Sequence, residues 1–260
     1  MSSLMDGKAG LVSGAASGIG RACAIRFAAE GASVVVADLE QARAGGEETV
    51  ARIREAGGQA EFFPCDVSVA ADAEALAGHV VERFGRLDFA HNNAGVGVHR
   101  LLHETSDEEF DRVIAVNLRG TFLGMKHQIR HMLTNFPPRG GAIVNTSSNA
   151  GLRAVTMLSA YTASKHGILG LTKNAAVEYA DHGVRVNAVC PGAIMTPLMS
   201  AQPPERQQEI LAPQAMTRFG DPAEVAAAVV WLCSEEASFV TGVALPVDAG
   251  SVAWVSAHRA

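Results

Sequence analysis

The stretch that decides the fold is Ser13-Gly14-Ala15-Ala16-Ser17-Gly18-Ile19-Gly20. An apolar strand pattern over Lys8–Ser13 runs directly into it, and an amphipathic helix pattern over Ile19–Glu30 follows. Glycines allow a tight turn here and let the backbone approach a pyrophosphate closely, while the helix N-terminus offers N–H groups to the phosphates. In this setting the glycine trio predicts a dinucleotide site. The residues expected to bind the phosphates are Gly14, Ser17, Gly18, Ile19 and Gly20.

Outward from this loop, short apolar strands alternate with longer helical stretches. The strands are rich in Val, Ile and Ala without polar alternation, which is typical of parallel strands covered on both faces. They are expected at Lys8–Ser13, Ser33–Ala37, Ala60–Pro64, Leu87–His91, Ala142–Thr146, Val184–Val189 and Val243–Val247. The helices are expected at Ile19–Glu30, Glu40–Ala56, Ser68–Phe84, Ser106–Met132, Ala160–His182 and Asp221–Ser234, with Ser68, Ser106 and Asp221 as N-caps.

This alternation predicts an α/β fold, a doubly wound parallel sheet with helices on both faces. No repeat or linker divides the chain, so residues 1–260 are expected to form one domain. The segment 197–214 is irregular and rich in Pro, Gln and Glu. Both a mobile substrate lid and an ordinary surface excursion fit this composition.

Composition excludes several classes of protein. The net charge of −6 and the lack of a Lys/Arg cluster argue against nucleic-acid binding. The longest apolar run, Val225–Cys233, is too short for a membrane span, and no secretory signal is evident. The four cysteines show no CxxC spacing, so they are expected to be buried, reduced thiols in a cytoplasmic protein without a metal site.

Polar residues stand at the ends of three expected strands, where open α/β sheets bind ligands. Asp38 follows the second strand, where a carboxylate accepts hydrogen bonds from ribose hydroxyls and repels a 2′-phosphate, which favours NAD as the cofactor. Asp66 with Val67 follows the third strand and is expected near the adenine. The turn Asn93-Ala94-Gly95 follows the fourth and is expected against the adenosine, whereas Asn92 is expected to be structural.

A candidate catalytic group lies further along the chain. Tyr161 and Lys165 are four residues apart at the start of a helix, so they share a face. A neighbouring ammonium favours the phenolate, which suits Tyr161 to acid–base catalysis. Ser148 follows the fifth strand and is expected to hold the substrate oxygen, and Asn117 to position water near Lys165. The residues expected to hold the carboxamide and phosphates after the sixth strand are Pro191, Gly192, Ile194 and Thr196.

With these motifs in place, the sequence resembles the short-chain dehydrogenase/reductase family, in its single-domain branch with TGxxxGIG and YxxxK motifs. The matching pieces run from Lys8 to about Gly250 and include Thr241-Gly242 and Asp248. The resemblance implies a seven-stranded Rossmann sheet, a homotetramer, and a catalytic tetrad of Asn117, Ser148, Tyr161 and Lys165. Two departures are evident: Ser13 replaces the usual Thr, and Ala249 replaces a usual Gly, which affects a turn.

The substrate is expected to be a small molecule, a secondary alcohol or ketone. Apolar residues at the expected pocket favour a cyclic or otherwise apolar one. These residues are Val96, Val98, Leu152, Val155, Met157, Leu198, Met199 and Met216. A sugar dehydrogenase and a 3-ketoacyl-thioester reductase of the same family remain alternatives, as does a catalytically silent dinucleotide-binding regulator. The C-terminal tail with Trp254 is a candidate contact to a neighbouring subunit.

Overall fold

The computed structural model describes residues 3–134, 140–212 and 214–253, so the tail around Trp254 lies outside the described residues. Its centre is a seven-stranded parallel sheet with the order β3-β2-β1-β4-β5-β6-β7. The strands are β1 Ala9–Ser13, β2 Ser33–Asp38, β3 Gln59–Pro64, β4 Phe89–Asn92, β5 Gly141–Thr146, β6 Val184–Pro191 and β7 Ala244–Val247. Each predicted strand is present, and the doubly wound Rossmann prediction is confirmed.

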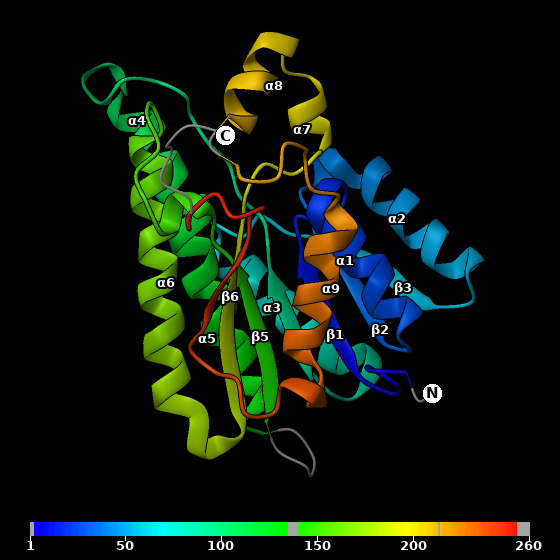
Figure 1. Cartoon of the computed structure of the whole chain (residues 1–260). Helices are drawn as coiled ribbons and strands as arrows, with labels where there is room; N and C mark the ends of the chain where they lie inside the picture. The colour runs from blue at the N-terminus through cyan, green and yellow to red at the C-terminus, as the bar shows by residue number, and fades with distance from the viewer. Residues whose placement is uncertain (1–2, 135–139, 213, 254–260) are drawn as a thin grey trace.

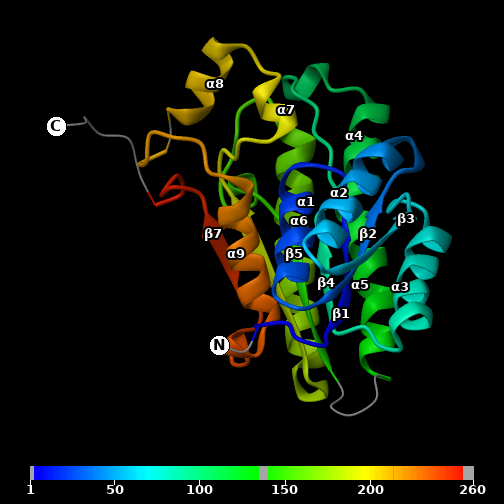
Figure 2. The ribbon, with the colours of Figure 1, turned by 90° about the vertical axis from the view of Figure 1, so that its right-hand side faces the viewer.

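Helices cover both faces of the sheet (Figures 1 and 2). On one face α1 packs between α2 and α9, and on the other α5 packs between α3 and α6. The bounds of these helices are α1 Gly18–Ala29, α2 Arg43–Glu55, α3 Ala70–Phe84, α5 Gly120–Met132, α6 Ser159–Tyr179 and α9 Pro222–Cys233. The core is built from Val, Ile, Leu and Ala of the strands and the inward faces of these helices.

The long helix predicted over Ser106–Met132 is interrupted. It consists of α4 (Asp107–Val113), a π-helical segment (Ile114–Arg119) and α5. The predicted cap is confirmed, because Ser106 and Glu109 form a reciprocal capping box. Asn117 lies within the π segment, and such segments are frequent at functional sites. The sequence pattern did not reveal this π-helical segment.

Two other expectations were wrong. Ser68 does not cap α3, because its N–H and hydroxyl both donate to Asp66 Oδ1 and close a turn before the helix, whose N-cap is Val69. The segment 197–214 is not irregular, since it holds α7 (Pro197–Ser200) and α8 (Pro204–Leu211). Pro occupies the first helical position in both, where its missing N–H costs nothing. Figure 1 shows both helices beyond one end of the sheet.

The four cysteines are buried and free, as predicted. Among the described residues, no helix is both long and apolar enough to cross a membrane, and no group of three or more His, Cys, Asp or Glu is placed to hold a metal.

Ala249 adopts a left-handed backbone conformation, with φ of 55°. Its carbonyl accepts hydrogen bonds from the N–H groups of Ala215 and Met216, so this conformation anchors the segment after α8. Ala249 thus adopts a turn conformation that is strained for any residue with a Cβ. We expect Ala249→Gly to raise the free energy of unfolding by about 1 kcal/mol. Glycine relieves the backbone strain of the left-handed conformation, and this gain exceeds the entropy that glycine adds to the unfolded chain.

Chemical denaturation of the two proteins measures this difference. Ala201→Gly is a matched control, because Ala201 is exposed and has an ordinary φ of −78°. Glycine there is expected to lower stability slightly. A lower stability for Ala249→Gly than for the parent would contradict the strain argument.

Candidate active site

The glycine-rich loop joins β1 to α1 at the carboxyl edge of the sheet. A Cβ at Gly14, where φ is 65°, would lie 2.8 Å from Ala94 Cα, and one at Gly20 would lie 2.1 Å from the Gly14 carbonyl oxygen. The loop therefore needs these glycines to close tightly. Ser17, the N-cap of α1, makes no side-chain cap, in contrast to the capped starts of α4 and α9. An α1 N-terminus without a side-chain acceptor suits an anionic group such as a pyrophosphate.

Asp38 ends β2 beside this loop. Its Oδ2 accepts from the Ala16 N–H at 2.9 Å and its Oδ1 from the Leu39 N–H at 2.9 Å. The carboxylate thus braces the loop at the position predicted to face the adenosine ribose. A nearby cation was missed by the sequence reasoning: Arg21 donates to the Ala16 and Gly45 carbonyls and pairs with Glu48 at 2.8 Å. Nε and Nη2 of Arg21 are thus used within the chain.

The turns after β3 and β4 flank the loop. Asp66 Oδ1 accepts from Ser68, so part of the carboxylate predicted to face adenine is used locally. Asn93 Nδ2 donates to the Ser13 and Gly14 carbonyls, and the Ser13 hydroxyl accepts from the Asn93 and Ala94 N–H groups. The side chain of Asn93 therefore holds the loop in place. Asn92 bonds Gln128 and Asn145 in the interior, which confirms its structural role.

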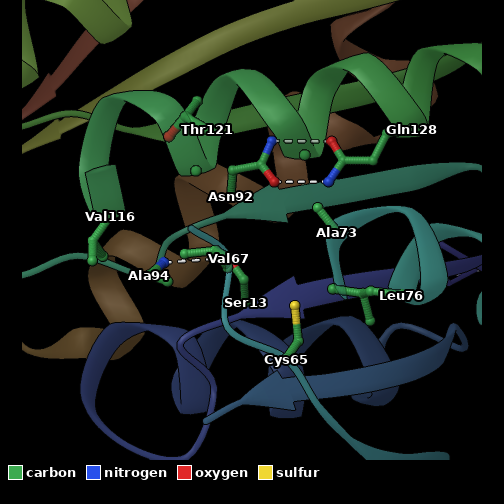
Figure 3. A pocket seen from close by; sticks show the side chains of 12 residues that line it. Ser13, Cys65, Val67, Ala73, Leu76, Asn92, Ala94, Val116, Thr121 and Gln128 are labelled. Carbon is green, nitrogen blue, oxygen red and sulfur yellow. Dashed lines mark hydrogen bonds between the residues drawn. The ribbon is translucent and has the colours of Figure 1, made fainter. Parts of the chain in front are cut away.

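A small cavity lies behind these turns (Figure 3). Its lining includes Ser13, Val67, Ala94 and Val116. Its volume of about 20 Å³ suffices for a water molecule and is far too small for a nucleotide ring. It marks the inner wall of the predicted adenosine region.

Ser148, Tyr161 and Lys165 come together from the segment after β5 and the first two turns of α6. Lys165 Nζ lies 5.3 Å from the centre of the Tyr161 ring, and the Ser148 side chain is near enough to the phenol to act on its pKa. Lys165 is buried and its Nζ donates to the Thr146 carbonyl oxygen at 2.7 Å. The sequence spacing thus brings a hydroxyl pair and an ammonium into one site.

In the chain without cofactor, burial is the main cause of the pKa shifts of Tyr161 and Lys165. It raises the pKa of the Tyr161 phenol, against which the hydrogen bond with Ser148 acts in the lowering direction. Burial also lowers the pKa of Lys165 to about 8. The expected shift of Tyr161 toward phenolate is therefore not produced by Lys165 within the chain, because the phenol and the ammonium share a desolvated site.

Asn117 is fully buried, and its side chain makes three hydrogen bonds. Its Oδ1 accepts from the Val96 N–H at 2.8 Å, and its Nδ2 donates to the Val96 carbonyl and to Ser164 Oγ. The side chain ties the loop after β4 to α6. This loop passes close to the catalytic candidate, since a Cβ at Gly97 would lie 3.5 Å from the Tyr161 ring.

The segment after β6 closes the site from the other side. A Cβ at Gly18 would lie 3.3 Å from Thr196 Cγ2, so the loop holding Pro191, Gly192, Ile194 and Thr196 reaches the start of α1. Gln214, which the sequence reasoning did not single out, is buried and its Oε1 accepts from the Ala193 N–H at 2.8 Å. A cavity of about 290 Å³ next to Ala193 and Ile194 is lined also by Met216 and Asp248, but not by Tyr161.

The rim of the site joins distant segments. Arg206 of α8 donates to His99 Nε2 in the loop after β4, and the Arg100 N–H donates to the Met157 carbonyl at 2.8 Å. Met157 itself has a left-handed φ of 64°. Met216, one of the residues predicted to make the substrate pocket apolar, is 59% exposed in the chain without a ligand.

Comparison with known proteins identifies the family to which this fold and site belong. A family model described as enoyl-(acyl carrier protein) reductase matches residues 14–251. Levodione reductase of Leifsonia aquatica is 39% identical, over 94% of this chain and 93% of its own. The 2,5-dichloro-2,5-cyclohexadiene-1,4-diol dehydrogenase of Sphingobium indicum is 42% identical, over 96% of this chain and 98% of its own.

Solved structures agree with these relatives. A crystal structure of levodione reductase aligns with a TM-score of 0.90 and 37% identity, over 96% of this chain and 99% of that chain. The fold and the relatives together define the class of this protein, an oxidoreductase with a Rossmann fold. The chain belongs to the short-chain dehydrogenase/reductase family, as its motifs indicated.

Proposed function

We propose that the chain is an NAD-dependent dehydrogenase/reductase that interconverts a cyclic or otherwise apolar secondary alcohol and its ketone. The observation that carries this proposal is the meeting of Ser148, Tyr161 and Lys165 beside the glycine-rich loop. The names of two relatives, a levodione reductase and a cyclohexadiene-diol dehydrogenase, favour a cyclic substrate.

When bound, a nicotinamide dinucleotide supplies or accepts the hydride. The chain's own residues manage the proton and the substrate oxygen. Ser148 holds that oxygen against Tyr161, whose phenol donates a proton to a forming alkoxide in reduction and whose phenolate accepts one from the alcohol in oxidation. Lys165, fixed on the Thr146 carbonyl, lies beside the ring and stabilises the phenolate once the phenol has lost its proton, although in the chain without cofactor burial dominates and keeps the pKa of the phenol raised. Asp38 orients the adenosine ribose.

A panel of cyclic secondary alcohols and ketones, assayed through NADH and NADPH absorbance, tests this proposal. Turnover of cyclic compounds with NAD(H) supports it. A preference for sugars or for 3-ketoacyl thioesters would favour the two alternative substrates. Tight NADH binding without turnover of any compound would favour a silent regulator. We also propose that α7 and α8 form a substrate lid, because Arg206 of α8 donates to His99 in the loop that follows β4.

We further propose a homotetramer, which the family resemblance implies and exposed apolar side chains on α5 and α6 support. Phe122 is 47% exposed and Val177 is 82% exposed. Such side chains gain by burial against another copy. We expect Val177→Glu to lower the assembly mass measured by light scattering at micromolar protein, because a carboxylate buried at an interface is costly.

Val69→Glu is the matched control, since Val69 is exposed at the start of α3, away from α6. It is expected to leave the assembly unchanged. A monomer mass for the parent protein would contradict the proposal.

A further inference from the structure

A buried histidine that the proposed mechanism does not use lies beneath the candidate site. His91 on β4 is completely covered by the fold. Its Nε2 lies 2.8 Å from Thr146 Oγ1 on the neighbouring strand β5, whereas its Nδ1 has no hydrogen-bond partner among the described residues. Burial lowers the pKa of His91 to about 3, so the ring is neutral and carries one proton.

The hydrogen bonds around it determine where that proton sits. Asn93 Nδ2 donates to two carbonyl oxygens, those of Ser13 at 3.1 Å and Gly14 at 3.2 Å, so the amide oxygen points the other way. That oxygen lies 3.3 Å from Thr146 Oγ1, and it bonds there only if the threonine hydroxyl donates. With its hydrogen used, Thr146 Oγ1 must accept from His91, which requires the proton on Nε2.

The opposite tautomer is disfavoured on two counts. A proton on Nδ1 would leave a buried N–H without an acceptor, which is rare and costly in native proteins. It would also turn the Thr146 hydroxyl toward His91 and leave the Asn93 oxygen without a donor. All donors are satisfied only when the bonds run from His91 to Thr146 to Asn93.

This chain of hydrogen bonds reaches both halves of the site. At one end Asn93 holds the Ser13 and Gly14 carbonyls of the glycine-rich loop. In the middle the Thr146 carbonyl accepts from Lys165 Nζ. Thr146 is therefore linked to the glycine-rich loop by the bond of its side chain to Asn93, and to Lys165 by its backbone carbonyl.

We propose that His91 is a positioning residue, which as the Nε2–H tautomer fixes Thr146 and thereby holds the glycine-rich loop and Lys165 in register. It touches neither substrate nor cofactor. The inference rests on the proposed function for its effect on turnover, but the tautomer is a property of the chain alone.

Two replacements of His91 separate its hydrogen bond from its bulk. The amide nitrogen of Gln is as many bonds from Cα as Nε2 of His, so His91→Gln keeps a donor for Thr146, and His91→Met removes it. We expect His91→Met to raise the Kd for NADH and lower kcat/KM by about tenfold, because a buried acceptor is left unpaired. His91→Gln is expected to recover most of both quantities.

His127→Met is the matched control, because His127 is also buried, on α5, and its Nδ1 lies 3.8 Å from the exposed Glu74 carboxylate. It should leave the Kd for NADH unchanged. If His91→Met and His127→Met behave alike, or if His91→Gln is as impaired as His91→Met, His91 only fills space and the inference is overturned.

Nitrogen-15 NMR of histidine-labelled parent protein gives a readout independent of turnover. His91 is expected to show the Nε2–H pattern, unchanged between about pH 5 and pH 8, because its pKa lies below that range. A protonated ring or an Nδ1–H pattern would overturn the inference whatever the enzyme's substrate. Absence of turnover in the parent, with the Nε2–H pattern present, would instead count against the proposed function.

Discussion

Replacing Tyr161 by Phe is expected to lower kcat by about 10²–10⁴-fold, the usual effect of removing a general acid or base. The substitution removes only the phenol hydroxyl and leaves the ring against Gly97. NADH binding should therefore persist, because the glycine-rich loop and Asp38 are untouched. Lys165→Met is expected to reduce both rate and cofactor affinity, since Lys165 is also expected to hold the ribose hydroxyls.

The chain contains one other tyrosine, which makes the control direct. Tyr179 ends α6 and packs against the His182 ring, far along the helix from Lys165. Tyr179→Phe should keep the parent kcat. Steady-state kinetics measure the rate, and the quenching of protein fluorescence by NADH measures binding. If Tyr161→Phe kept turnover within about threefold of the parent, well outside the usual range for a lost acid–base group, the assignment of Tyr161 would be wrong.

The second large effect concerns cofactor choice. We expect kcat/KM to favour NAD over NADP by more than about tenfold, because roughly 1.4 kcal/mol gives that factor and charge-assisted hydrogen bonds contribute more. The Asp38 carboxylate would bond the ribose hydroxyls of NAD and repel the phosphate of NADP. We expect Arg21 to offset little of this repulsion, because its charge is paired with Glu48 and its Nη2 also donates to two carbonyl oxygens.

The structure sharpens the choice of variants at this position. Asp38 also accepts from the Ala16 N–H, so Asp38→Ala removes both a charge and a brace of the loop. Asp38→Asn keeps an oxygen for that N–H and removes only the charge. If charge decides the preference, both variants lose NAD selectivity, and Asp38→Asn binds NADH better than Asp38→Ala. Leu39→Arg added to Asp38→Asn should raise NADP use further. Equal use of both cofactors by the parent would refute the role of Asp38.

The sequence predicted most of the fold because its signals are local. The apolar runs and the Asp221-Pro222 helix start lie within single elements, and the structure has them at nearly the predicted bounds. The helices at Pro197 and Pro204 were missed because the segment is rich in Pro, Gln and Glu and has no clear apolar period, although Pro at a first helical position is compatible with a helix. The left-handed Ala249 depends on contacts with Ala215 and Met216, which no local pattern encodes.

For the candidate site, the sequence indicated which residues take part but not the contacts that each side chain makes. Residue types and strand ends indicated Ser148, Tyr161 and Lys165, which the structure brings together. The use of each side chain could not be predicted, because it depends on partners distant in sequence. Asn117 engages Val96, Asn93 engages Gly14, and Arg21 engages Glu48. The raised pKa of Tyr161 likewise follows from burial, which motif spacing does not report.

The strand order has a consequence for how the protein reaches its native state. β1 pairs with β4, so Gly10 lies beside Phe89, while β2 and β3 occupy the outer edge beyond β1. The glycine-rich loop and the turn holding Asn93 can meet only after this long-range pairing, which is entropically slow compared with helix formation. Helical content during refolding therefore reports local structure. Cofactor binding reports completion of the central sheet, and it is the more stringent measure of correctly folded protein.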